Sequence, residues 1–228
     1  LGARYRVHAT SRNLNNRVGV PLTILSAPDD TEALVVEAGA SVPGEIAKLR
    51  DIIEPTIAVI TNIGYAHVEG FGSLEGVMAE KLSLLDRAPV AILGSGPDAM
   101  WPEARLRTQV IPAALPGKTA DDTLLDRYLD KDGHPRLTLD SGETITLPAL
   151  GIHQLENAQI ALAVAQRAGV DHDAAVRALA GLQLPEGRGD VREVGGLLVI
   201  DDSYNANPAS MRRAVQSRRA VMTAWRIW

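Results

Sequence analysis

Cysteine is absent from the 228 residues of this chain. Disulfide bonds and thiolate metal sites are therefore excluded, and the composition is compatible with a reducing cytoplasm, where we expect the protein to reside. The chain also lacks an apolar run that approaches the length of a membrane span, and its first residues do not follow the pattern of a secretory signal peptide. We therefore expect no insertion into a membrane.

An excess of positive charge is lacking as well. Lysine and arginine total 23 against 28 aspartate and glutamate residues, which gives a formal net charge of −5. A mildly acidic chain has no broad electrostatic attraction for nucleic acid or for an anionic membrane surface. Hydrophobic residues make up 46%, enough for a sizeable core, and the length suits one large domain or one domain plus part of another. Because the chain begins with Leu1 rather than methionine, we expect the true start to lie upstream.

Continuous apolar runs alternate with helical patterns in the first part of the chain. The runs that predict strands are Arg4–Ala9, Ala33–Ala38, Thr56–Ile60 and Pro89–Leu93, and the segments that predict helices are Pro43–Ile53 and Ser73–Arg87. Ser73 is a candidate N-cap three residues before Gly76. This alternation predicts an α/β fold, with a mostly parallel sheet flanked by helices in which Ala33–Ala38 and Thr56–Ile60 share one sheet.

The second part of the chain has a different pattern. Alternating apolar and polar residues predict an antiparallel hairpin, Arg136–Leu139 with Thr144–Leu147, as a small element at the edge of the sheet. Alanine-rich helices follow at Gln154–Ala168 and His172–Leu182, then a linker at Pro185–Gly189 and a second hairpin, Val191–Val194 with Leu197–Ile200. We place a domain boundary near Leu184. The residues after Met211 begin like a helix, and we expect a truncated or altered C-terminus there.

Polar residues follow two of the predicted strands, where ligands of parallel sheets bind. Glu37 ends an apolar run and precedes three small residues, and its carboxylate is a natural ligand for Mg²⁺. The pair Thr61–Asn62 ends the next run and leads to the segment His67–Ser73. Taken alone, Glu37 is explained equally well as a solvated strand end. A surface histidine and a solvated helix lysine are the simpler explanations of His67 and Lys81.

Five segments, taken in order, resemble the Mur ligase family of ATP-dependent amide ligases. They are HATSRNLNNRVGVPLTIL, VVEAGASVPGEI, ITNIGYAHVEGFGSLEGVMAEK, LPEGRGDVREVGG and VIDDSYNANPASM, and together they extend from about Arg4 to Met211. Five motifs in order are far more specific than a single glycine-loop match. Within the family, the segments are most similar to the branch that adds D-alanyl-D-alanine to the cell-wall precursor UDP-N-acetylmuramoyl-tripeptide.

The resemblance implies roles for individual residues near the phosphates. Glu37 and His67 match the magnesium ligands, and Lys81 matches a lysine that is carbamylated and becomes an anionic metal ligand. Arg188 matches a linker arginine that reaches the phosphates of ATP. Lys81, His67 and Arg188 are thus the implied catalytic residues. Phosphoryl transfer to a carboxylate and attack by an amine both place negative charge on phosphoryl oxygens, which Mg²⁺ and an arginine stabilise.

The resemblance also implies residues that bind the nucleotide and the substrate. Those matching nucleotide-binding positions are Asn157, Arg188, Asp202, Asn205 and Asn207. Asn15 and Asn16 match the positions that bind the UDP-sugar peptide. The family's usual sequence motif at the adenine-binding position is H-N-x-x-N, and this chain has Gln154 in place of the first asparagine. The implied ligands are ATP, Mg²⁺, UDP-MurNAc-peptide and D-alanyl-D-alanine, all small molecules, and we expect a monomer.

The resemblance further implies a domain organisation. Residues 1–184 match the central ATP-binding domain, which is related to the P-loop nucleotidases, and residues 185–228 match the beginning of a Rossmann-like C-terminal domain. The family's phosphate loop, G-x-x-G-K-[ST], does not occur in the 228 residues. We therefore expect the chain to be a fragment of an active ligase, inactive by itself. Two alternatives stay open: a Mur-type ligase for another amino acid, and a non-catalytic relative that binds nucleotide or substrate.

Overall fold

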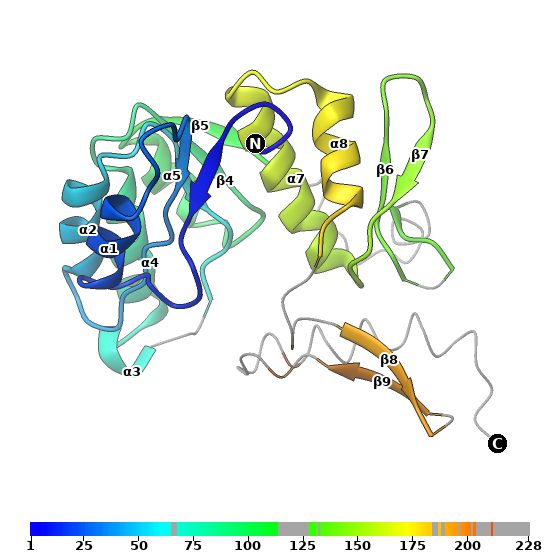
Figure 1. The fold of residues 1–228 in the computed structure, drawn as a ribbon. Coiled ribbons are helices and arrows are strands. Elements are labelled where there is room, and N and C mark those ends of the chain that lie inside the picture. Colours follow the sequence, from blue (N-terminus) through cyan, green and yellow to red (C-terminus); the bar gives the residue numbers. More distant parts are fainter. Residues whose placement is uncertain are drawn as a thin grey trace. The chain divides into compact units, whose positions relative to one another are not determined.

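A computed structural model describes residues 1–64, 68–113, 128–131, 133–183, 190–195 and 197–201, together with residues 187, 203 and 211. The chain divides into two compact units, one formed by residues 1–113 and 163–170 and the other by the remaining described residues. Figure 1 shows helices and parallel strands in the first unit, and hairpins together with helix α8 (His172–Ala180) and most of α7 (Ile152–Arg167) in the second. Among these described residues, no helix is long and apolar enough to cross a membrane.

The first unit contains a short parallel pair of strands. β1 (Val7–Ala9) pairs with β2 (Ala33–Val35), and Val7 lies opposite Ala33. Both strands are shorter than the apolar runs that predicted them. Leu34 and Val35 are 40% and 45% exposed. This pair of strands is therefore only partly covered within the described part of the chain.

A second parallel sheet forms the core of the first unit. Its strand order is β3 (Ala58–Ile60), β4 (Val90–Leu93) and β5 (Gln109–Pro112), and all four residues of β4 are buried. β2 and β3 belong to separate sheets, so the prediction that Ala33–Ala38 and Thr56–Ile60 share one sheet is wrong. An apolar run predicts a strand, but it does not specify which strand accepts its hydrogen bonds. The fold class is confirmed, because parallel sheets flanked by helices are present.

Helices surround the strands of the first unit. They are α1 (Gly19–Leu25), α2 (Glu45–Ile53), α3 (Val68–Phe71), α4 (Leu74–Leu82) with the 3₁₀ turn η1 (Ser83–Leu85), and α5 (Met100–Arg105). The side chains of Val77 on α4 and Met100 on α5 join one buried cluster with Ala91 and Leu93 of β4. Burial of such side chains contributes the largest share of the unit's stability.

The start of α4 follows the sequence prediction. The hydroxyl of Ser73 accepts a hydrogen bond from the N–H of Gly76 at 3.2 Å, which confirms Ser73 as the N-cap. The helix ends earlier than predicted, because the chain tightens into η1 at Ser83 and Arg87 has a positive φ of 120°. α2 begins at Glu45 rather than Pro43, since Gly44 occupies the N-cap in the left-handed region with φ of 83°.

The second unit joins a hairpin to one whole helix, α8, and to the part of α7 that ends at Leu162. β6 (Arg136–Thr138) pairs antiparallel with β7 (Thr144–Thr146), while α7 (Ile152–Arg167) and α8 (His172–Ala180) follow. Leu137, Leu155 and Val176 meet in the core of this unit. The hairpin is confirmed, but among the described residues its strands pair only with each other, so it does not extend the edge of a parallel sheet.

A second hairpin follows, formed by β8 (Asp190–Val194) and β9 (Leu197–Asp201). Its antiparallel register places Val194 opposite Leu197, as the sequence predicted, and each strand is one residue longer than expected. The predicted linker falls mostly outside the described residues, as does the segment after Met211.

Candidate functional site

Glu37 follows β2 and is held by residues of the loop after β1. Its carboxylate oxygen Oε1 accepts a hydrogen bond from Nδ2 of Asn15 at 2.8 Å, and its backbone N–H donates to the hydroxyl of Thr10 at 2.9 Å. The N–H of Gly39 donates to the carbonyl of Asn15 at 2.7 Å. A Cβ at Gly39 would lie 3.0 Å from the Asn15 side chain, so glycine lets Asn15 approach closely. Asn15 thus orients the Glu37 carboxylate.

Asn16 stabilises the start of α1 through its side chain. Its side-chain oxygen accepts hydrogen bonds from the N–H groups of Val18 at 3.0 Å and Gly19 at 2.9 Å. A Cβ on Gly19 would lie 2.4 Å from the backbone of Leu14, so this turn requires glycine. These bonds satisfy N–H groups that have no partner inside the helix. The predicted substrate role of Asn16 stays a prediction.

Lys81 lies in the last turn of α4 and is partly buried. Burial lowers the pKa of its amine, because the charged form loses solvation, while the negative charge of Glu37 opposes the shift. Glu37 and Lys81 are therefore close enough to interact electrostatically, although they come from different elements and lie 44 positions apart in the sequence. This interaction is compatible with a shared metal site, and the predicted convergence of Glu37 with Lys81 stays a prediction.

The remaining predicted residues of the phosphate and ribose sites lie outside the described residues. These are His67, Arg188, Asp202, Asn205 and Asn207. Their assignments rest on the sequence resemblance, and the predicted convergence with His67 stays a prediction.

Asn157 lies on α7 in the second unit, with its side chain exposed. Its amide Nδ2 donates a hydrogen bond to Oε1 of Gln154 at 3.2 Å. The glutamine that departs from the family pattern therefore contacts the asparagine that the resemblance assigns to the adenine. The longer side chain of Gln154 can reach one helical turn forward and fix the Asn157 amide.

Sequence reasoning missed Glu80, which directly precedes Lys81. Only 8% of this residue is exposed. Its carboxylate accepts hydrogen bonds from the N–H groups of Gly44 and Ile46, both at 2.7 Å. The one available signal was its helical spacing from the buried Val77, three residues earlier, which places both on one face. That spacing alone does not distinguish a buried glutamate from a solvated one.

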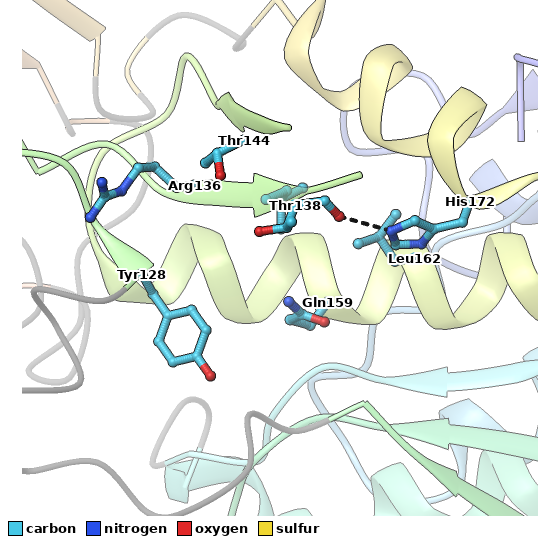
Figure 2. Close-up of a pocket in the computed structure, with 8 residues that line it drawn as sticks. Tyr128, Arg136, Thr138, Thr144, Gln159, Leu162 and His172 are labelled. Atoms are coloured by element: carbon cyan, nitrogen blue, oxygen red, sulfur yellow. Dashed lines mark hydrogen bonds between the residues drawn. The ribbon is translucent and has the colours of Figure 1, made fainter. Parts of the chain in front are cut away.

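The second unit contains a hollow beside the hairpin β6–β7. It has a volume of about 340 Å³, and its lining comes from the segment before β6, the hairpin β6–β7, α7 and the start of α8 (Figure 2). The lining residues are Tyr128, Arg136, Leu137, Thr138, Thr144, Gln159, Leu162 and His172. Of the assigned residues that the structure describes, namely Asn15, Asn16, Glu37, Lys81 and Asn157, none is in this lining.

Three potential metal ligands meet near the same hairpin. Ligand atoms of Asp140, His172 and Asp173 lie within 4.8 Å of one another. Asp173 accepts a hydrogen bond from the N–H of Asp140 at 2.8 Å, and Nε2 of His172 lies 3.1 Å from the Thr138 carbonyl oxygen. These contacts join the start of α8 to the hairpin, which explains the cluster without a metal.

Comparisons with known proteins give a consistent result. The family model of the Mur ligase middle domain matches residues 1–165. The UDP-N-acetylmuramoyl-tripeptide–D-alanyl-D-alanine ligase of Bacillus subtilis is 34% identical over 220 residues, covering 95% of this chain and 48% of the relative. The ligase of the same name from Escherichia coli is 33% identical, and the match covers 91% of this chain and 48% of the relative.

Solved structures show the same similarity. A crystal structure of MurF from Acinetobacter baumannii has a TM-score of 0.81 at 31% identity, covering 95% of this chain and 49% of that chain. MurF ligase from Thermotoga maritima in complex with ADP has a TM-score of 0.80 at 28% identity, covering 95% and 51%. The chain thus spans about half the length of these relatives.

Proposed function

Because this chain belongs to the Mur ligase family, we propose that it is part of an ATP-dependent ligase that joins D-alanyl-D-alanine to UDP-N-acetylmuramoyl-tripeptide. The relatives of B. subtilis and E. coli carry the name of this activity and match at least nine-tenths of the chain. The reaction makes an acyl phosphate from the tripeptide carboxylate and ATP. The amine of the dipeptide then attacks the acyl carbon, forms the amide and releases phosphate.

The similarity to ligases that are named for this activity carries the proposal, and the arrangement of Glu37 and Asn15 supports it. A Mg²⁺ site needs oxygen ligands, and Glu37 supplies an exposed carboxylate whose orientation Asn15 fixes. Lys81 would add a second oxygen ligand if its amine were carbamylated. Glu37, Lys81 and His67 would hold the metal, which when bound supplies positive charge to phosphoryl oxygens. The residues present therefore fit a magnesium site.

The position of Lys81 favours carbamylation. Only the neutral amine attacks CO₂, and burial lowers the pKa of Lys81, which increases the neutral fraction near neutral pH. The new N–C bond forms as the amine loses one proton to solvent, and the product is a carbamate with one negative charge. A fully solvated lysine would be almost entirely protonated at the same pH.

Nucleotide binding extends the proposal to the second unit and the linker. Asn157, with its amide oriented by Gln154, is assigned to the adenine, and Arg188 to the ATP phosphates. Asp202, with Asn205 and Asn207, is assigned to the ribose. The T. maritima relative was solved in complex with ADP, which supports a nucleotide site in the family.

The organisation of the chain is part of the proposal. Residues 1–184 would be the central ATP-binding domain and residues 185–228 the start of the C-terminal domain, in accord with a family match over residues 1–165. Asn15 and Asn16 would lie at the UDP-sugar peptide. We further propose a monomeric cytoplasmic enzyme.

The test is a substrate panel on a complete ligase that carries this segment. Phosphate release and product mass are measured with ATP, Mg²⁺ and UDP-MurNAc-tripeptide, and the amine is varied. We expect turnover with D-alanyl-D-alanine and at least about 100-fold less with L-alanine, D-glutamate or meso-diaminopimelate, since a site built for one amine loses its polar contacts with another. Preference for a single amino acid would favour another Mur-type ligase. No turnover with any amine, despite nucleotide binding, would favour the non-catalytic alternative.

A further inference from the structure

Glu80 on α4 contacts the start of another helix. Its Oε2 accepts a hydrogen bond from the N–H of Gly44, the N-cap of α2, and its Oε1 accepts one from Ile46 in the first turn, both at 2.7 Å. A single buried carboxylate thus satisfies two N–H groups that have no partner within α2. The positive end of the α2 dipole favours the same negative charge.

A second connection joins these helices on the other side of Lys81. Arg50, near the end of α2 and 8% exposed, donates from Nη1 to the carbonyl of Ser83 at 2.8 Å. The Ser83 hydroxyl donates to the carbonyl of Glu80 at 2.6 Å. Residues on both sides of Lys81 are therefore hydrogen-bonded to α2: Glu80 through its carboxylate and Ser83 through its carbonyl.

The same helix is connected to the segment that carries Glu37. Residues 38–44 lead from Glu37 to α2. Within this loop, the N–H groups of Ser41 and Val42 donate to Oε2 of Glu45 at 2.8 and 3.2 Å, which holds the loop on the first turn of α2. The start of α2 is thus hydrogen-bonded both to the loop that follows Glu37 and to Glu80, the residue before Lys81.

We infer that Glu80 is a positioning residue: by fixing α4 on the first turn of α2, it sets the placement of Lys81 relative to Glu37. Both of its oxygens are engaged by backbone N–H groups, so it acts through helix placement rather than as a metal ligand. The catalytic consequence of this inference rests on the proposed function, whereas the structural consequence does not.

The structural test is amide hydrogen exchange in the 228-residue chain with Glu80→Gln. Glutamine keeps the shape, but its NH₂ group replaces an acceptor and faces an N–H donor. We expect the Gly44 and Ile46 amides to exchange about tenfold faster, which corresponds to about 1.4 kcal/mol. The amides of β4 should be unaffected. Glu75→Gln, at the exposed start of the same helix, is the matched control and should leave Gly44 and Ile46 unchanged. Unchanged exchange in Glu80→Gln would overturn the inference.

The catalytic test uses a complete ligase that carries this segment. We expect Glu80→Gln to lower kcat about tenfold and to raise the Mg²⁺ concentration for half-maximal rate, with KM for the dipeptide unchanged. Glu80→Asp keeps the charge with a shorter reach and should fall between Glu80→Gln and the wild type, whereas Glu75→Gln should match the wild type. If Glu80 only stabilised the fold, Glu80→Gln would give less folded protein, and the kcat of each folded molecule would be unchanged.

The outcomes separate the two claims. If Glu80→Gln shows faster exchange at Gly44 and Ile46 but has the kcat and Mg²⁺ dependence of the wild type, the positioning role is overturned. The proposed function is then unaffected, because the wild-type ligase is active. An inactive wild type would overturn the proposed function, and the exchange measurement would still decide whether Glu80 fixes α2 on α4.

Discussion

Lys81 combines partial burial with the nearby charge of Glu37, and this combination predicts the result of removing its amine. In a complete ligase, Lys81→Ala should lower kcat about 100-fold or more, because an anionic group beside the phosphates is lost. Acetate at high concentration should restore part of the activity, since it supplies the missing carboxylate oxygen, and an equal concentration of chloride should not. Lys48→Ala, which removes an exposed lysine of α2, is the control and should keep wild-type activity. Full activity of Lys81→Ala without additive would show that Lys81 has no part in catalysis.

Single residues were predictable where a local rule applies. The N-cap role of Ser73 follows from its place before an apolar helical stripe, and the structure confirms it. The convergence of Glu37 with Lys81 was predicted from the family resemblance alone. Their spacing in the sequence does not predict it. Glu80 was missed because its partners, Gly44 and Ile46, lie more than 30 positions away in the sequence and offer only backbone groups.

At the scale of elements, the start of α2 depends on a carboxylate of its own first turn. Hydrogen bonds from the N–H groups of Ser41 and Val42 lower the pKa of Glu45 below its ordinary value of 4.5. The stabilisation is therefore present above about pH 4.5 and is lost as the pH falls through the lowered pKa of the folded state. Urea unfolding should show wild type more stable than Glu45→Gln at pH 6, with the gap shrinking toward pH 3. A gap that is equal at both pH values would contradict this role of the charge.

The buried strand β4 predicts a clear difference between two leucines. Leu93 is 0% exposed, whereas Leu106, just after α5, is 82% exposed. Leu93→Ala should lower the free energy of unfolding by about 2–5 kcal/mol, because it removes buried methyl groups and leaves a cavity. Leu106→Ala should change it by less than about 0.5 kcal/mol. Urea unfolding of the two variants measures both values, and equal losses would contradict the assignment of the core.

Elements with strong periodicity were predicted better than those without it. The hairpin β6–β7 and the helices α7 and α8 follow their sequence patterns to within about two residues. α1, α5 and β5 were not predicted: the two helices span only seven and six residues, and all three elements are too short for a clear period. The separate pairing of β2 and β3 could not be predicted, because pairing is decided by packing and not by the composition of a run.

At the scale of the whole molecule, the activity should require more than these 228 residues. The sequence contains no G-x-x-G-K-[ST] motif, and positioning of the phosphates supplies most of the catalysis of phosphoryl transfer. The purified 228-residue chain should therefore release phosphate from ATP at the rate of a buffer control, with or without tripeptide and dipeptide. Substrate-dependent phosphate release by this chain would contradict the expectation and would mean that the phosphates are held in another way.

We propose that Glu37, Lys81 and His67 form the magnesium site of an amide ligase. The most direct measurement is the Mg²⁺ dependence of dipeptide-dependent phosphate release in a complete ligase, compared among wild type, Glu37→Gln and the exposed control Glu103→Gln of α5. Loss of one carboxylate ligand should raise the half-maximal Mg²⁺ concentration about tenfold or more, in the range found when groups that orient metal ligands are removed. Glu103→Gln should match the wild type. A Glu37→Gln ligase with wild-type Mg²⁺ dependence and rate would contradict the account.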